Sequence, residues 1–273
     1  MLAALPLLVL AAPGCGGAEE SDPPAPASSD VPEEAGTGRA AATPKYEGPR
    51  GPIDLAQTGT ITGVVRFEGD SPERKELSIG GTGGCPHHAE PVFEESVVVA
   101  DGRVANVFVW IKDGLDGWEI PPSDGRTVDM DQKGCLYLPH VLGMRAGETL
   151  LVHNSDLETT HNVNIRSRSN DSLNPVQPPN GQPVEWRPRK REIGVSFECN
   201  LHPWMKAWVC VVDHPWHAVT AADGSFVLEG VPPGEYVIEA WHEKLGKKTR
   251  NVALEPAGSA EAGFTYRATD KGR

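Results

Sequence analysis

The sequence predicts an all-β protein, and two observations indicate this class. The chain of 273 residues contains 30 glycines and 25 prolines, which leave room for few long helices. From about residue 58 onward, short segments alternate apolar and polar residues with a period of two, and turn residues separate these segments. No internal repeat is long enough to indicate a solenoid or a propeller. We therefore expect β-sandwich architecture behind a non-globular N-terminus.

The first fifteen residues have the features of an export signal. Residues 1–14 (MLAALPLLVLAAPG) are apolar and end in small residues directly before Cys15. The segment resembles the signal of bacterial lipoproteins, in which the cysteine is lipidated and becomes the new N-terminus. This resemblance implies an exported protein of the bacterial cell envelope, in the periplasm or on the outer surface, with contact to the membrane only through a lipid on Cys15.

Residues 16–56 are rich in Pro, Ala, Ser, Gly and Glu and poor in large apolar side chains. Such a segment cannot bury enough surface to offset the entropy that ordering would cost, so we expect a disordered linker. Behind a lipidated cysteine, this linker would let the folded part reach partners away from the membrane.

The net charge of −13 argues against nucleic acid as a partner, because phosphate binding requires a clustered basic surface. One segment departs from this acidic character. Its charged residues are Arg166, Arg168, Arg187, Arg189, Lys190 and Arg191, against Asp171 and Glu185. A solvated loop is the simplest interpretation, and a docking patch for an acidic partner is the alternative.

Up to residue 199, the folded region contains four predicted strand segments. These are residues 58–69, a hairpin over 96–111 with its turn at Asp101-Gly102, residues 147–154 and residues 192–199. In the last segment, the side chains of Ile193, Val195, Phe197 and Cys199 should share one face. The thiol of Cys199 would therefore point into the core at the end of a strand.

The C-terminal part continues with turns and strands. The strand AWVCVVD ends at residue 213; beyond it, Asp223-Gly224 and a VPPG turn separate two strands, and RNVALEP and AGFTYRA supply two more. With its DGSF and VPPGEY motifs, this part resembles the carboxypeptidase regulatory-like β-sandwich, an Ig- or transthyretin-like domain.

The resemblance sets the expected domain boundaries. We assign residues 214–273 to the regulatory-like sandwich and residues 57–213 to the domain before it. Residues 58–69 also resemble the opening strand of regulatory-like modules. The alternative is therefore that the N-terminal strands belong to the C-terminal sandwich and that the other domain is inserted between them.

The segment ECNLHPWMKAW (198–208) carries the side chains best suited to a metal ion. Cys199, His202 and Met205 follow one another at three-residue steps on a loop that leaves a strand. A copper ion that shuttles one electron is held by two imidazoles and a thiolate in a near-trigonal arrangement, with a weak axial thioether. The second imidazole must come from elsewhere, and His161 in NSDLETTHNV is the candidate.

Two segments resemble the cupredoxin family. The upstream segment, residues 137–165, matches in its Tyr137-x-Pro139 start, its turn at Gly147, its Asn-Ser-Asp sequence at 154–156 and its His161-Asn162 pair. The downstream segment has the Cys-x2-His-x2-Met spacing of amicyanin. Together the two segments fall within residues 135–213.

This resemblance implies a Greek-key β-sandwich that holds one type-1 copper ion. His161, Cys199 and His202 would bind copper strongly, and Met205 weakly. Asn162 would tie the two ligand loops together by hydrogen bonds. His202 would present its ring edge to solvent, within an apolar patch that includes Pro203 and Trp204.

Other interpretations of the same residues are simpler when each motif is taken alone. A lone Cys-x2-His is more often a buried thiol beside a surface imidazole, and a lone Met205 is most often a core residue. The matching segment around His161 favours copper instead. Zinc is the chief rival metal, but methionine is a poor zinc ligand and structural zinc sites favour paired Cys or His.

The remaining cysteines and histidines are harder to interpret. In an oxidising compartment we expect a disulfide between Cys85 and Cys135, which leaves Cys210 as a core thiol. CPHH (85–88) could bind a second metal ion, although adjacent histidines are more often loop residues. His140 and His153 should be structural, and no chemistry is assigned to His214, His217 or His242.

The sequence favours an electron carrier over an enzyme. Cys199 is flanked by Glu198 and Asn200, and no His-x-His pair exists, so the ligands of a multicopper oxidase cluster are missing. We expect single electrons to pass to or from an envelope redox partner, such as a cytochrome, a dehydrogenase or a terminal reductase. The alternative is a non-catalytic module that binds carbohydrate or protein and has a structural or vestigial metal site. Trp216 and Trp241 could stack on sugar there, though core packing is the simpler role.

Overall fold

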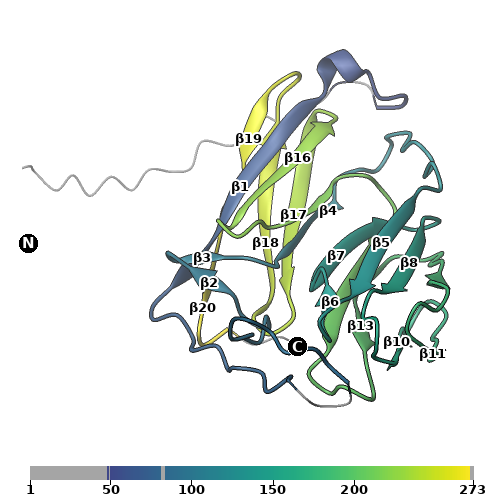
Figure 1. The fold of residues 1–273 in the computed structure, drawn as a ribbon. Helices are drawn as coiled ribbons and strands as arrows, with labels where there is room; N and C mark the ends of the chain where they lie inside the picture. Colours follow the sequence, from purple (N-terminus) through teal and green to yellow (C-terminus); the bar gives the residue numbers. More distant parts are fainter. Residues whose placement is uncertain (1–47, 49, 81–83, 271–273) are drawn as a thin grey trace, which may run out of the picture. The chain divides into compact units, whose positions relative to one another are not determined.

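A computed structural model describes residues 48, 50–80 and 84–270, and the described part of the chain is all-β, as predicted (Figure 1). The predicted export signal with Cys15 and most of the predicted linker lie outside the described residues. The described end of the linker carries one 3-10 turn, η1 (Leu55–Gln57), which is capped by the Asp54 side chain. No helix among the described residues is long and apolar enough to span a membrane.

Ten strands from the two ends of the described chain form one sandwich, which we call the host sandwich. One of its sheets contains β1 (Gly59–Glu68), β2 (Val99–Ala100), β3 (Arg103–Val104), β16 (Ser225–Val231), β19 (Ser259–Glu261) and β20 (Phe264–Arg267). The other runs in the order β15 (His217–Val219), β4 (Phe108–Asp113), β17 (Gly234–His242) and β18 (Gly246–Leu254). In the first sheet β1 is central, because it pairs antiparallel with β16 and β3 and parallel with β19 and β20.

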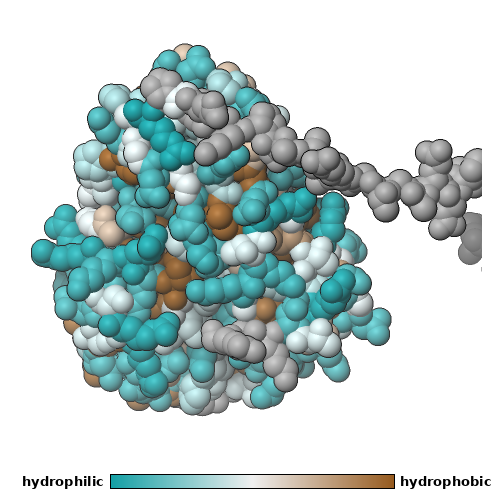
Figure 2. Space-filling model, turned by 180° about the vertical axis from the view of Figure 1, so that it is seen from behind, coloured by the Kyte–Doolittle hydropathy of each residue, from teal (hydrophilic) through white to brown (hydrophobic). Residues whose placement is uncertain are grey.

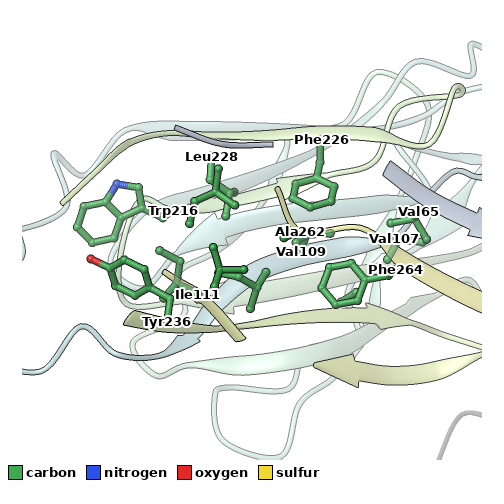
Figure 3. Packing of buried hydrophobic residues seen from close by; sticks show 14 of the residues in the cluster. Val65, Val107, Val109, Ile111, Trp216, Phe226, Leu228, Tyr236, Ala262 and Phe264 are labelled. Atoms are coloured by element: carbon green, nitrogen blue, oxygen red, sulfur yellow. The ribbon is translucent and has the colours of Figure 1, made fainter. Parts of the chain in front are cut away.

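The core of the host sandwich lies between these two sheets (Figure 3). Aliphatic side chains from β1 and β4, such as Val65 and Ile111, meet aromatic rings from the C-terminal strands, such as Phe226 and Phe264. Because successive side chains of a strand point to opposite faces, β1 alternates buried and exposed residues along most of its length.

The ten strands in between form a second sandwich, which we call the inserted sandwich. Its first sheet runs in the order β10 (Asn164–Arg166), β13 (Glu192–Glu198), β14 (Lys206–Val212) and β7 (Val141–Arg145). Its second sheet runs in the order β12 (Val184–Trp186), β8 (Thr149–Asn154), β5 (Thr127–Gln132) and β6 (Tyr137–Leu138). A two-stranded ribbon, β9 (His161–Asn162) with β11 (Val176–Gln177), completes it.

The strand pairing corrects the predicted boundary at residue 57. The hairpin turn at Asp101-Gly102 is confirmed, but β1 and β4 pair with strands that follow residue 214, and β2 and β3 extend the sheet of β1. None of the four pairs with the inserted sandwich. The alternative of an inserted domain is therefore the arrangement observed. Local alternation could not distinguish the two, because a strand's pattern shows which face is buried and not which sheet it joins.

A bulge in β13 corrects a second expectation. Its pairing with β14 shifts register between Glu192 and Val195, and Gly194 there has a φ of +78°. Val195, Phe197 and Cys199 face the core of the inserted sandwich as predicted, but Ile193 packs on the opposite side of the sheet. An extra residue at a bulge reverses the alternation before it, and Gly194 is the residue that permits the left-handed conformation.

The two sandwiches belong to one compact unit and share a third apolar cluster, which we call the junction. It consists of Phe108, Trp110, Val141, Cys210, Val212 and Trp241. Because β4 and β17 supply one side and β7 and β14 the other, each of these strands is apolar on both faces. The face of the molecule seen in Figure 2 is largely hydrophilic, with apolar residues in small separate groups.

Candidate metal centre

Three donor atoms converge at one end of the inserted sandwich. The Nδ1 atoms of His161 and His202 lie 3.0 Å apart, and the sulfur of Cys199 lies 3.5 Å from His202 Nδ1 and 3.9 Å from His161 Nδ1. All three side chains are buried, with exposed fractions of 0–2%. Ligands that bind one metal ion at about 2.0–2.3 Å lie roughly 3–4 Å from one another, so this donor set fits a single ion.

The strand ends and one short loop hold these side chains in place. His161 lies on the β9–β11 ribbon, and Cys199 directly follows β13. The loop from Cys199 to Met205 closes through two backbone hydrogen bonds, from Cys199 N to Met205 O and from Met205 N to His202 O. Met205 is 1% exposed and packs in the same core cluster as Cys199. The loop therefore presents the thiol, an imidazole and a thioether from one turn of chain.

Asn162 joins the two ligand-bearing segments. Its Oδ1 accepts hydrogen bonds from Asn200 N at 2.7 Å and from the Cys199 thiol at 3.5 Å, and its Nδ2 donates to Asn174 at 2.6 Å. The hydroxyl of Tyr137 adds a second link, because it donates to the backbone carbonyls of Asn162 and Glu198. These bonds fix the distance between the His161 segment and the Cys199 loop.

Asp156 is a site residue that the sequence analysis did not single out. Its Oδ2 accepts from His161 Nε2 at 2.8 Å, and its two oxygens also accept from the backbone N–H groups of Gly134 and Cys135. An imidazole that donates from Nε2 keeps Nδ1 free as a donor atom, which is the atom that faces Cys199 and His202. In the sequence, Asp156 could have been recognised as a candidate partner of His161, because it is a carboxylate five residues before the histidine, inside the Asn-Ser-Asp motif.

The electrostatics of the metal-free site follow from these contacts. Burial works against the charged form, yet the hydrogen bond that His161 donates to Asp156, followed by the interaction with Cys199, raises the pKa of His161 above its usual value. The pKa of the Cys199 thiol is lowered, because its hydrogen bond with His161 and nearby backbone N–H groups outweigh burial. Burial, followed by the charge on His161, lowers the pKa of His202. A deprotonated thiol and a neutral imidazole are the forms that bind metals.

The environment of His202 corrects the expected solvent-exposed ring edge. His202 is only 2% exposed, although its neighbour Leu201 is 55% exposed and Pro203 is also exposed. The ring of Trp204 lies with its centroid 5.4 Å from that of His202. The sulfurs of Cys85 and Cys135 lie within 4.8 Å of a ring nitrogen of His202, and they are bonded to each other at 2.04 Å. A disulfide and an indole therefore cover the imidazole.

The structure also places the other residues that the sequence analysis considered. Cys210 is a buried free cysteine in the junction, and Trp216 and Trp241 are buried at 4% and 8% exposure. His88 of the CPHH motif hydrogen bonds to Gly134 O, and His87 lies beside Gly80. In the basic segment, Arg166 pairs with Glu198, Arg168 with Glu192 and Arg191 with Asp213.

Comparisons with known proteins give matches to solved structures only, since no protein-family model and no curated protein sequence matches the chain. A reduced mutant of amicyanin is 22% identical, with a TM-score of 0.29, over 33% of this chain and 85% of amicyanin. The purple cupredoxin from Nitrosopumilus maritimus is 20% identical, with a TM-score of 0.27, over 31% of this chain and 99% of that protein.

A third match is the Cu-containing nitrite reductase (NirK) from Thermus scotoductus SA-01. It is 18% identical, with a TM-score of 0.30, over 44% of this chain and only 26% of the reductase. The structures similar to part of this chain are thus cupredoxins, at low coverage. No family membership follows from matches of this size.

Proposed function

We propose that this chain is an exported type-1 copper protein that transfers single electrons to or from a redox partner in the cell envelope. One observation carries the proposal, namely the convergence of two imidazole Nδ1 atoms and one thiol sulfur within 3.0–3.9 Å at a buried position. Two imidazoles, one thiolate and a nearby thioether form a donor set that suits copper better than zinc, magnesium or calcium.

When bound, copper would supply a one-electron couple between Cu(I) and Cu(II). His161, Cys199 and His202 would hold the ion, with Met205 as the weak fourth ligand. The protein's own contribution is rigidity. Asn162 and Tyr137 fix the spacing of the two ligand segments, and Asp156 fixes the orientation of the His161 ring. A site that cannot rearrange favours transfer, because little has to move when the charge of the ion changes.

The finer parts of the proposal are supported by the sequence. Flanking residues Glu198 and Asn200 favour a carrier over an oxidase, and residues 1–15 favour export with a lipid on Cys15. The DGSF and VPPGEY motifs favour a carboxypeptidase regulatory-like host sandwich, which would position the metal-bearing domain for a partner such as a cytochrome or a dehydrogenase.

The test is the visible spectrum of the purified chain after addition of one equivalent of Cu(II). We expect an intense thiolate-to-copper band that is lost in Cys199→Ala and retained in Cys210→Ala, the matched variant at the second buried free cysteine of the described residues. A colourless protein, or one in which both variants behave alike, would rule out a type-1 centre. Tight tetrahedral binding of Zn(II) in preference to copper would point to a structural site instead.

A further inference from the structure

The Cys85–Cys135 disulfide lies directly against the proposed ligands. Its two sulfurs and a ring nitrogen of His202 all lie within 4.8 Å of one another, and Cys135 Sγ forms a similar cluster with Asp156 and His161. Both cysteines are buried, at 5% and 0% exposure. Cys85 comes from the segment between β1 and β2, some 50 residues before Cys135. A crosslink from a distant part of the chain therefore closes the site on the side of His202.

The two halves of this crosslink are anchored differently. Cys135 belongs to a turn whose N–H groups donate to Asp156, and its carbonyl accepts from Trp204 Nε1 at 2.9 Å. These bonds involve the inserted sandwich alone and do not depend on the disulfide.

Residues 84–88, which we call the cover segment, rest on that turn from outside. Thr159 donates to Gly84 O at 2.6 Å, and His88 donates to Gly134 O at 2.8 Å. The contact is close, because a Cβ atom at Gly134 would lie 2.7 Å from His88 Cε1. Apart from these contacts the cover segment is largely exposed, with Pro86, His87 and His88 open to solvent. The covalent bond at Cys85 is thus the principal tie between the cover segment and the site.

A groove of about 830 Å³ gives access to this bond. Its lining includes Cys85, Pro86 and His87 from the cover segment, together with Leu138, Asp156 and Leu157. Leu157 is 74% exposed and Leu138 is 40% exposed, so the rim is apolar and open. Cys85 lines the groove and is 5% exposed, whereas Cys135 does not line it and is 0% exposed, so Cys85 is the half of the disulfide nearer to an incoming thiolate.

We propose that the Cys85–Cys135 disulfide is a second redox site of this protein, which a dithiol of the thiol–disulfide exchange class reduces through this groove, and that its reduction uncovers His202. The inference builds on the proposed metal site, but it concerns the protein's own sulfurs and can be tested without a metal.

The exchange proceeds in two steps. A thiolate of the reductant attacks Cys85 Sγ, which forms a mixed disulfide and releases Cys135 as a thiolate that takes a proton from solvent. The second thiolate of the reductant then attacks the reductant's first sulfur, which is bonded to Cys85 in the mixed disulfide. This step releases Cys85 as a thiolate, which is protonated in turn. The reductant leaves as a disulfide, and two electrons have passed to the cysteine pair.

Reduction has two consequences for the site. The cover segment loses its covalent tie, so solvent and small solutes can reach the ring of His202. In addition, two thiols replace a disulfide beside the donor set, and thiolates are soft ligands that favour Cu(I). The oxidised pair would therefore keep a loaded site closed, and the reduced pair would open it for metal exchange.

The test measures the reactivity of His202 in the metal-free full chain. The oxidised protein and the protein treated with a reduced thioredoxin-type dithiol protein are exposed to diethylpyrocarbonate, and each histidine is quantified by peptide mass spectrometry. We expect His202 to react at least about tenfold faster after reduction. His153, with a side chain that is 38% exposed, serves as the accessible reference, and His161, held by Asp156, serves as the buried one.

Alkylation of the same samples reports which cysteines were reduced. Labelling of Cys85 and Cys135 in the folded chain is expected, and labelling only after unfolding would overturn the proposal. So would a His202 that stays as unreactive as His161 once the bond is broken. Cys85→Ser, which removes the crosslink without a reductant, should show the fast His202 reaction, whereas Cys210→Ser should match the oxidised wild type. Near-UV circular dichroism establishes that each variant is folded.

A metal-loaded arm separates this proposal from the proposed function. If the copper band forms, its removal by a chelator should be at least about tenfold faster in Cys85→Ser than in Cys210→Ser, and equal rates would overturn the cover. If no copper band forms in any variant, the proposed function fails, while the reactivity of His202 still decides whether the disulfide is a removable cover.

Discussion

The metal end and the junction between the sandwiches bury the same kinds of side chains, a free cysteine and several histidines, with different results. Near the junction, both ring nitrogens of His214 form hydrogen bonds with the backbone: Nε2 donates to Ile111 O at 2.8 Å, and Nδ1 accepts from Trp216 N at 3.2 Å. At the metal end, His161 uses only Nε2, on Asp156, and its Nδ1 faces His202 and Cys199. The two regions therefore differ in whether several donor atoms without backbone partners face one another. The residue types alone do not distinguish the metal site from the apolar core.

The two cysteines show the same contrast. Burial raises the pKa of the Cys210 thiol well above its usual range, which keeps it protonated and inert. The pKa of Cys199 is lowered by His161 and by backbone N–H groups, against the effect of burial. Cys199 and Cys210 lie on opposite faces of one sheet, so the side of the sheet decides which thiol is reactive.

The largest expected effect on copper binding comes from exchanging one cysteine for serine on each face. Cys199→Ser should weaken Cu(II) binding by a factor of about 100 or more, because it removes the only thiol of the donor set. Cys210→Ser should leave Cu(II) affinity unchanged. Isothermal titration with a competing chelator measures both. Equal affinities would show that copper does not bind at the converging donors.

Removing the disulfide should have the largest effect on stability. Cys85 and Cys135 close a loop of about 50 residues, and opening it should lower the free energy of unfolding by about 4 kcal/mol. Urea unfolding of Cys85→Ser/Cys135→Ser measures the loss, with Cys210→Ser as the control. A loss below about 1 kcal/mol would mean that the inserted sandwich holds the segment before β2 without the bond.

Acid should destabilise the chain through the histidines outside the metal site. Burial lowers the pKa of His214 and of His242 from 6.5 to about 4. Between these values the unfolded chain binds protons more tightly, so stability falls as the pH drops through that window, by about 2 kcal/mol for each histidine at pH 5.

His242→Gln tests this effect on one residue. The glutamine oxygen can still accept from the N–H groups of Lys244 and Leu245, which bond to His242 Nδ1, but it does not titrate. The difference in unfolding free energy between pH 7 and pH 5 should shrink by about 2 kcal/mol. A difference that stays as large in His242→Gln as in the wild type would contradict the assignment.

The smallest expected effect concerns two carboxylate–histidine pairs. Asp156 bonds to buried His161 at 2.8 Å, and Asp129 bonds to partly exposed His153 at 2.7 Å. Asp156→Asn should weaken copper affinity roughly 10- to 100-fold, because it disturbs the hydrogen bond that holds the ligand ring. Asp129→Asn should have no effect. If both variants bind copper as the wild type does, Asp156 does not position His161.

The sequence predicted what depends on local order. The all-β class followed from alternation, and the turn at Asp101-Gly102 has the positive φ values, 49° and 68°, that such a hairpin requires. Cys199, His202 and Met205 were found together because one short loop carries them. The upstream partner His161 required the resemblance to cupredoxins, since no local rule joins residues that lie 38 positions apart in sequence.

The features that were missed depend on distant contacts. His202 was expected at the surface because the resemblance to cupredoxins implies an exposed ring edge, whereas part of its cover comes from Cys85, far upstream. Ile193 was assigned to the wrong face because the bulge at Gly194 is visible only in the pairing with β14. The insertion of one sandwich into the other depends on which strands pair, which alternation does not encode.

X-ray absorption spectroscopy of the Cu(II)-loaded chain tests the central claim most directly, since it reports the atoms bound to the ion. We expect the copper ion to be bound by two nitrogen ligands and one sulfur ligand, with the sulfur lost in Cys199→Ser and unaffected in Cys210→Ser. Nitrogen and oxygen ligands alone in the wild type would rule out the proposed centre, because copper would then be bound somewhere other than between His161, Cys199 and His202.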